Sequence, residues 1–211
     1  QAAQHFGVVI NMPAEPNEML IITDNSCKPS FVAADLLSQA EHGTDSQVIL
    51  LSDNESVIDA TLSELDKQLA ALPRKDIAKK AIENSKAILL GSIAGCIEFS
   101  NLYAPEHLIL AVNEARSLVP AITKAGSVFL GNYSCESAGD YASGTNHTLP
   151  TNGYARNYSG VSLDSFVTKI TFQELTREGI QNIGPAIELM ADAEHLFAHK
   201  NAVTLRLREK K

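Results

Sequence analysis

The chain alternates short, wholly apolar runs with longer amphipathic stretches, and this alternation limits the folds open to it. Five apolar runs are expected to be strands: residues 20–23, 47–51, 87–90, 108–112 and 127–130. Helical patterns lie between them, over residues 29–42, 56–72, 76–85 and 115–124. Strands that are apolar on both faces and alternate with helices are typical of a mostly parallel sheet with helices on either side. The sequence therefore predicts an α/β fold.

The last fifty residues have a different character. One more strand is expected over residues 167–172, followed by an almost continuous helical pattern over 174–199 and a basic tail. We therefore expect residues 159–211 to form a separate, mainly helical C-terminal module. A glycine-containing segment at 91–95 lacks the spacing of a dinucleotide fingerprint, and we interpret it as a tight strand-to-helix turn.

A polar segment of twenty residues, 131–150 (GNYSCESAGDYASGTNHTLP), lies between these two regions. It has almost no aliphatic side chains, so we expect it to form a loop rather than a helix or strand. Loops held by a rigid scaffold often carry catalytic and binding residues. A solvated surface loop is the alternative, and the segment alone does not decide between them.

Composition excludes several classes of partner. The formal net charge of −8 argues against binding to nucleic acid or to an anionic membrane surface. No apolar stretch approaches the length needed to span a bilayer, and the first residues lack the pattern of a signal peptide. The three cysteines are far apart, which favours reduced thiols in a cytoplasmic protein.

Three pairs of residues have spacings that suit chemistry. Gln39 and His42 project from one helical face, although a histidine at a helix end is also common for dipole reasons. The neighbours Glu106 and His107 could supply an acid and a base, or be two solvated residues at the start of a strand.

His195 and His199 have the i, i+4 spacing of a metal pair, with chance placement on a solvated face as the alternative. Together with nearby carboxylates, these residue types suit zinc or manganese better than a thiolate site.

Five motifs, taken together, closely resemble histidinol dehydrogenase. They are SQAEHG at 38–43, YAPEHL at 103–108, GSVFLG at 126–131, SAGDYASGTNH at 137–147 and AHKNAV at 198–203. The resemblance covers essentially the whole chain, in order. It implies an incomplete Rossmann-like sheet over residues 19–158, a dimerisation role for residues 159–211, and a segment at 1–18 that returns from an absent N-terminal domain.

The resemblance also implies a zinc site shared across a homodimer. Its ligands would be Gln39, His42, Asp140 and, from the second subunit, His199, which leaves His195 on the surface. The family reaction is two NAD-dependent oxidations, from L-histidinol through L-histidinal to L-histidine. His107 would be the general base and Glu106 would activate water. The full set of substrate-binding residues implied is Asn17, Gln39, His42, His107, Asp140, Tyr141, His147, Glu194 and His199.

Two departures from the family pattern are visible. Residues 13–18 read PAEPNE, which places Asn17 where the family has a serine or threonine and Glu15 where it has a glycine. The half of the family's chain that contributes most NAD contacts is absent, so the NAD-binding residues stay unknown. Two alternatives remain: a catalytically silent zinc-binding dimerisation module, and a zinc-dependent hydrolase that uses Glu106 to activate water.

Overall fold

The structure is a computed structural model that describes residues 16–209. Its chain divides into two compact units, residues 1–167 and 168–211, which are described separately below. The division falls later in the chain than the boundary expected after residue 158. Residues 159–167 stay with the first unit because Val161 N donates to Thr148 O and Gly160 packs against Leu149.

The first unit is built on a five-stranded sheet in which every pair of neighbouring strands is parallel. The strand order is β3-β2-β1-β4-β5. The strands are β1 (Glu18–Thr23), β2 (Gln47–Ser52), β3 (Lys86–Leu89), β4 (His107–Ala111) and β5 (Ser127–Leu130). The α/β class and the parallel sheet predicted from the sequence are therefore confirmed.

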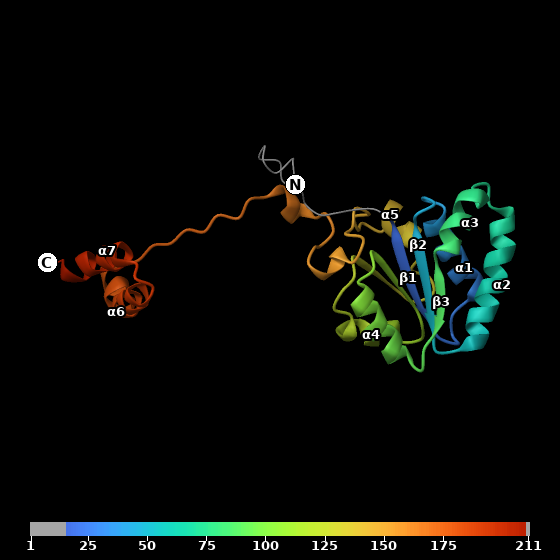
Figure 1. Ribbon diagram of the computed structural model, residues 1–211, viewed down its shortest axis with the longest axis horizontal. Coiled ribbons are helices and arrows are strands. Elements are labelled where there is room, and N and C mark those ends of the chain that lie inside the picture. The colour runs from blue at the N-terminus through green and yellow to red at the C-terminus, as the bar shows by residue number, and fades with distance from the viewer. Residues whose placement is uncertain (1–15, 210–211) are drawn as a thin grey trace. The chain divides into compact units, whose positions relative to one another are not determined.

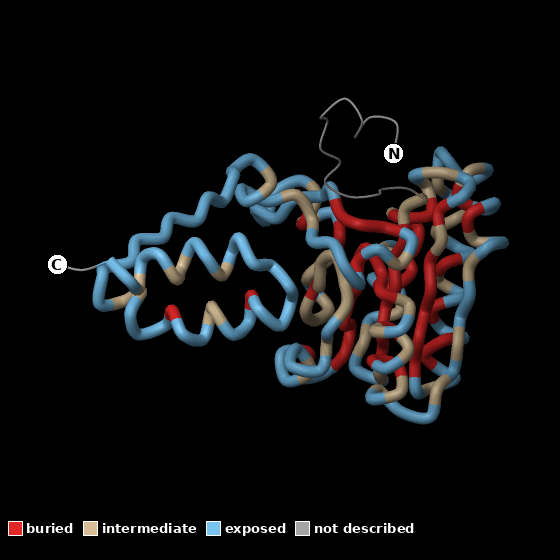
Figure 2. Tube along the Cα trace, turned by 60° about the vertical axis from the view of Figure 1, so that its left-hand side comes forward, coloured by how far each residue is buried: buried red, intermediate tan, exposed pale blue. Residues whose placement is uncertain are grey.

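Helices cover both faces of this sheet, which explains why the central strands are apolar throughout. One face lies against α1 (Pro29–Ala40), α2 (Glu55–Ala71) and α3 (Lys75–Glu83). The other lies against α4 (Ile93–Tyr103) and the 3₁₀ helix η2 (Ala115–Ala121). Figure 1 shows α1, α2 and α3 on one side of the sheet and α4 on the other. The central strands form the buried part of this unit (Figure 2).

Local signals set several element boundaries. Pro29 begins α1, where its missing N–H costs nothing. The Asn54 side chain accepts from Ser56 N at the start of α2, and Ser92 accepts from Gly95 N at the start of α4. The segment at 91–95 is therefore the strand-to-helix turn that the sequence predicts.

Three predicted elements were wrong. The helix expected over 115–124 is the shorter 3₁₀ helix η2, which contains Pro120. Residues 167–172, all of them described, form no strand. The polar segment 131–150 is not all loop, because Glu136–Tyr141 forms the short helix α5.

The second unit consists of two packed helices, α6 (Arg177–Ala193) and α7 (Phe197–Arg208). The almost continuous helical pattern expected over 174–199 is interrupted at His195, which has a left-handed φ of 58°. At Gly184 the helices approach so closely that a Cβ would lie 2.7 Å from Leu207 Cδ2. Large apolar side chains nevertheless remain exposed on this unit, among them Leu189, Met190, Phe197 and Leu205. None of the helices in the described part of the chain is long and apolar enough to cross a membrane.

The central strand β1 should dominate stability. We expect Ile21→Ala to lower the free energy of unfolding of the first unit by about 2–5 kcal/mol, because the side chain is fully buried between sheet and helices. Leu102→Ala, on an exposed position of α4, is the matched control and should change it by less than about 0.5 kcal/mol. Urea denaturation measures both, and equal losses would contradict this assignment of the core.

Candidate active site

The polar residues that could do chemistry gather at the amino edge of the sheet, where β1 and β4 begin. Glu18 is the first residue of β1 and His107 the first of β4, and the register pairs Met19 with His107. Glu106 stands immediately before β4, and its Oε2 accepts from Glu18 N at 2.8 Å. All three side chains are buried.

Gly126 holds the Glu106 backbone in place. Gly126 N donates to Pro105 O and Ser127 N donates to Glu106 O. A Cβ at Gly126 would lie 2.5 Å from Glu106 O, so only glycine allows this approach. The segment before β4 is thereby fixed against the start of β5.

The His107 imidazole lies between two carboxylates. Its Nε2 is 3.6 Å from Glu106 Oε1 and 3.5 Å from Glu136 Oε1. The Phe129 ring of β5 is 6.0 Å from the imidazole, measured between ring centroids. His107 Nδ1 is buried and has no hydrogen-bond partner among the described residues. The Glu106 and His107 side chains therefore lie against each other. Adjacent residues within a strand normally face opposite ways, but Glu106 precedes β4 and is not bound by this rule.

Glu136 reaches His107 from α5, the helix inside the polar segment. Its side chain is 2 % exposed. The helix can lie this close to β5 because Gly139 has no side chain: a Cβ there would be 2.6 Å from the Phe129 ring. Ser38 Oγ on α1 donates to Glu136 Oε2 at 3.1 Å. Three separate elements therefore meet at this one carboxylate.

Gln39, near the end of α1, is fully buried beside this group. With the amide oriented to satisfy its neighbours, its nitrogen donates to both Glu136 oxygens and its oxygen accepts from Glu18 N at 3.3 Å. The amide that the resemblance assigns to zinc is thus hydrogen-bonded to the same carboxylate that contacts His107.

Burial sets the protonation of this cluster. Burial raises the pKa of Glu136 from 4.5 to about 7, although the nearby His107 charge opposes this. Burial likewise raises the pKa of Glu18 from 4.5 to about 7. Burial of His107 would lower its pKa, but Glu106, Glu136 and Asp140 outweigh that effect and the pKa is raised above 6.5. Groups with pKa values near neutrality suit acid–base work.

A candidate metal site adjoins the cluster. One ligand atom from each of His42, Glu136 and Asp140 lies within 4.8 Å of the other two. An imidazole nitrogen with carboxylate oxygens is a donor set that fits Zn²⁺. The C-terminal end of α1, near which Gln39 and His42 lie, also favours a positive charge. The residues present are therefore compatible with zinc.

The other predicted site residues are not gathered in the same way. Tyr141 and His147 are exposed residues of the polar segment. Asn17 immediately precedes β1, and its backbone oxygen accepts from Gln47 N. Glu194, His195 and His199 belong to the helical unit, where all three are exposed. Glu15 lies outside the described residues.

Glu136 is the residue that sequence reasoning missed. Glu136 and Asp140 are four residues apart, which on a helix places both carboxylates on one face. That spacing could have found it, but only once the segment was recognised as helical.

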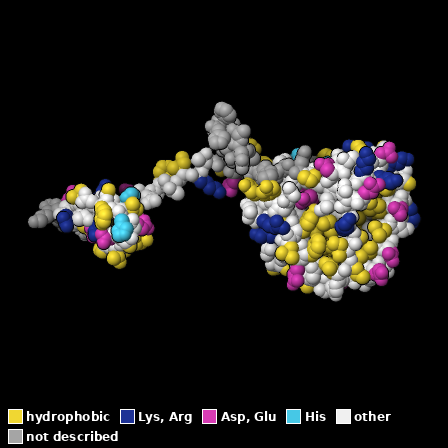
Figure 3. Space-filling view, viewed as in Figure 1, with side chains coloured by type: hydrophobic (Ala, Val, Ile, Leu, Met, Phe, Trp, Pro, Cys, Tyr) yellow, Lys and Arg dark blue, Asp and Glu magenta, His cyan; other side chains and the backbone are white. Residues whose placement is uncertain are grey.

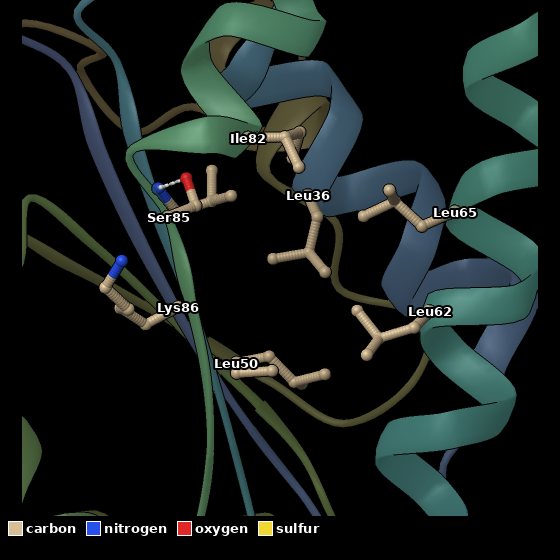
Figure 4. Close-up of a pocket in the computed structure, with 9 residues that line it drawn as sticks. Leu36, Leu50, Leu62, Leu65, Ile82, Ser85 and Lys86 are labelled. Atoms are coloured by element: carbon tan, nitrogen blue, oxygen red, sulfur yellow. Dashed lines mark hydrogen bonds between the residues drawn. The ribbon is translucent and has the colours of Figure 1, made fainter.

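A separate apolar cavity of about 110 Å³ lies between β2, β3 and the helices α1 and α2 (Figure 4). Leu36, Leu50 and Leu65 point into it, and its lining includes no acid or histidine. Ser85 Oγ accepts from Val48 N at its rim. Hydrophobic side chains also gather on the visible surface near β3 and its neighbouring helices (Figure 3). The cavity lining contains none of the residues that the sequence analysis assigned to catalysis, substrate or metal.

The loops at the standard dinucleotide position of this sheet are hydrogen-bonded to each other. In doubly wound sheets ligands usually bind at the carboxyl edge where the strand order reverses, here between β1 and β4. Asp24 after β1 accepts from Asn113 N after β4 at 2.9 Å, and from Ser26 N at 2.8 Å. This carboxylate links the two loops that flank the position where a standard dinucleotide site would lie.

The fold and the cluster define a class of protein: a parallel α/β domain with a buried acid–imidazole centre beside a candidate metal site. The sequence matches the family model described as histidinol dehydrogenase over residues 2–207. The chain belongs to the histidinol dehydrogenase family.

Individual relatives agree. A histidinol dehydrogenase from Bacteroides fragilis (strain YCH46) is 58% identical over 202 residues, which cover 96% of this chain and 47% of that protein. One from Pectobacterium atrosepticum is 54% identical over 201 residues, covering 95% of this chain and 46% of that protein. The crystal structure of histidinol dehydrogenase from Elizabethkingia anophelis has 67% identity and a TM-score of 0.95, over 98% of this chain and 48% of that one. The chain therefore spans about half the length of its relatives.

Protonation of Glu18 should make stability depend on pH. Its pKa is higher in the fold than the usual 4.5, so its contribution is complete below pH 4.5 and is lost as the pH rises through about 7. Relative to Glu18→Gln, we expect the wild-type free energy of unfolding to fall by about 3 kcal/mol across that window, because each pKa unit of the shift is worth about 1.4 kcal/mol. Denaturant titrations at a series of pH values, without divalent metals, measure this difference.

Glu98→Gln, an exposed position on α4, is the control and should keep the wild-type pH dependence. If Glu18→Gln also keeps it, Glu18 is ionised in the folded chain across this range.

Proposed function

We propose that this chain is the C-terminal half of a histidinol dehydrogenase that oxidises L-histidinol through L-histidinal to L-histidine, the last step of histidine biosynthesis. The observation that carries the proposal is the buried Glu106–His107 pair beside the His42–Glu136–Asp140 group, in a chain of this family. A biosynthetic role in the cytoplasm fits the three free cysteines of the chain.

In this proposal the zinc ligands are Gln39, His42, Asp140 and the partner copy's equivalent of His199. Zinc, when bound, would supply a fixed positive charge that orients the imidazole and amine of the substrate. Asn17, Tyr141, His147 and Glu194 would complete the substrate pocket.

The acid–base roles follow from burial and proximity. His107, which has a neighbouring carboxylate on two sides, would accept the substrate's hydroxyl proton in each oxidation. Glu106 would take a proton from the water that hydrates the aldehyde, since its carboxylate lies beside His107. The buried surroundings would exclude competing water. The hydride acceptor of the family is NAD, and we assign its binding mainly to the half that this chain lacks.

A homodimer is also part of the proposal. The helical unit is too small to bury its own apolar residues, and the chain leading into it exposes Val167, Ile170, Phe172 and Leu175 as well. Exposed apolar surface of this extent is typical of an interface. A second copy that covers it would bring His199 to the zinc site.

The direct test is an assay for NADH production from L-histidinol, with this chain alone and with the missing half added. We expect activity only when both halves are present. Full activity of the chain alone would show that the NAD contacts lie within it, and no activity from the combined halves would contradict the proposal.

His107→Asn separates the base from the metal site. In the combined halves we expect it to lower kcat by at least about 100-fold, because the group that accepts the hydroxyl proton is gone. Bound zinc, measured by elemental analysis, should remain at the wild-type amount. His195→Ala is the control and should leave both zinc and kcat unchanged, whereas loss of zinc in His107→Asn would move His107 into the metal shell.

A second candidate is a catalytically silent zinc-binding dimerisation module. It is favoured by the closeness of the His42 and Asp140 ligand atoms in a chain that spans only half of its relatives. Zinc content and the mass in solution test it: a zinc-free monomer removes this candidate, and activity of the combined halves favours the enzyme.

A further inference from the structure

The candidate site contains one buried acid to which neither the resemblance nor the proposed reaction gives a role. Glu136 is 2 % exposed, receives donors from α1 and lies beside an imidazole of β4. Ser38 Oγ donates to its Oε2 at 3.1 Å, and the Gln39 amide nitrogen donates to both of its oxygens. His107 Nε2 lies 3.5 Å from its Oε1. A buried carboxylate with this many donors is held in one position.

We propose that Glu136 is a positioning residue that fixes the general base His107 and the metal-binding amide of Gln39 relative to each other. The inference rests on the proposed function. It adds a physical connection between the metal-binding group and the acid–base pair, because one carboxylate from α5 contacts both a residue of α1 and a residue of β4. Groups that hold a ligand or a base in this way commonly affect catalysis without touching the substrate.

A direct role as metal ligand is the competing assignment, because a Glu136 oxygen lies near His42 and Asp140. Both Glu136 oxygens, however, already accept from the amide of Gln39, and one accepts from Ser38 as well. These three hydrogen bonds occupy most of the roughly four lone-pair sites of the carboxylate, so the Gln39 and Ser38 donors compete with a metal for this group. His42, by contrast, is exposed and free to turn toward a metal.

Glu136→Gln tests the proposal, since it keeps the size of the side chain but turns one acceptor oxygen into a donor that faces other donors. With this chain and the missing half combined at saturating zinc, we expect kcat to fall about 10–100-fold and KM to stay within about threefold of the wild-type value. Zinc should still bind this chain stoichiometrically, with an affinity lowered by no more than about 100-fold in competition with a chelator. Glu98→Gln is the matched control.

Three results of the kinetic and zinc measurements on Glu136→Gln would overturn the proposal. A kcat equal to that of Glu98→Gln would leave Glu136 without a role, and a raised KM with unchanged kcat would make it a substrate contact. Loss of stoichiometric zinc binding would make it a metal ligand. If Glu136→Gln does not fold, Ser38→Ala replaces it, because removal of this donor loosens Glu136. We expect Ser38→Ala to lower kcat severalfold at unchanged KM. An unchanged kcat would equally overturn the proposal.

A spectroscopic arm separates this proposal from the proposed function. In this chain alone, the ring ¹⁵N signals of His107 should move in Glu136→Gln and stay in place in Glu98→Gln. Inactive wild-type halves would contradict the dehydrogenase assignment, while the ¹⁵N signals would still report on the contact. Unchanged His107 signals in folded Glu136→Gln would overturn the positioning role even if the wild-type enzyme is active.

Discussion

Burial of several carboxylates around one imidazole is the constraint on which the rest of this site depends. Glu106 and Glu136 are removed from water beside His107, and Glu18 is buried at the start of the neighbouring strand β1. Buried acids are costly unless they are neutral or hydrogen-bonded, and here both remedies are used: raised pKa values and donors from neighbouring backbone and side chains. Each acid comes from a different segment, so the cluster exists only when the sheet register and α5 are correct.

The site lies at the amino edge of a parallel sheet, which is the opposite of the usual arrangement. At the carboxyl edge, Asp24 ties the loops after β1 and β4 together, and Pro29 removes an N–H from the start of α1. At the amino edge lies the C-terminal end of α1, where the helix dipole favours a cation. The same helix that is poorly suited to a phosphate at one end is therefore well suited to a metal or an imidazolium at the other.

The alternation of apolar runs and amphipathic stretches was sufficient to predict the parallel sheet, because burial on both faces leaves a direct mark on each strand. The site was harder to predict. Helix α5 has no apolar stripe, and it forms because Gly139 lets it pack directly on Phe129, a contact invisible in the local sequence. Glu136 was missed for this reason. The resemblance alone assigned Gln39 to zinc, since a neutral amide is not distinctive by itself. Glu106 was a candidate from its place beside His107, and the resemblance chose between its catalytic and solvated interpretations.

The helical unit shows why a zinc site of the proposed kind would depend on assembly. Its two helices pack closely at Gly184 but bury few residues, so it has little core of its own. A ligand such as His199 on this unit would bind zinc only when the unit is docked on a further surface. Binding of the metal and docking of the helices would then stabilise each other by mass action. In such an arrangement the apolar surface supplies the affinity of docking, and the histidine fixes the exact docked position. A histidine ligand must lie about 2.0–2.1 Å from the metal, whereas an apolar contact tolerates displacement.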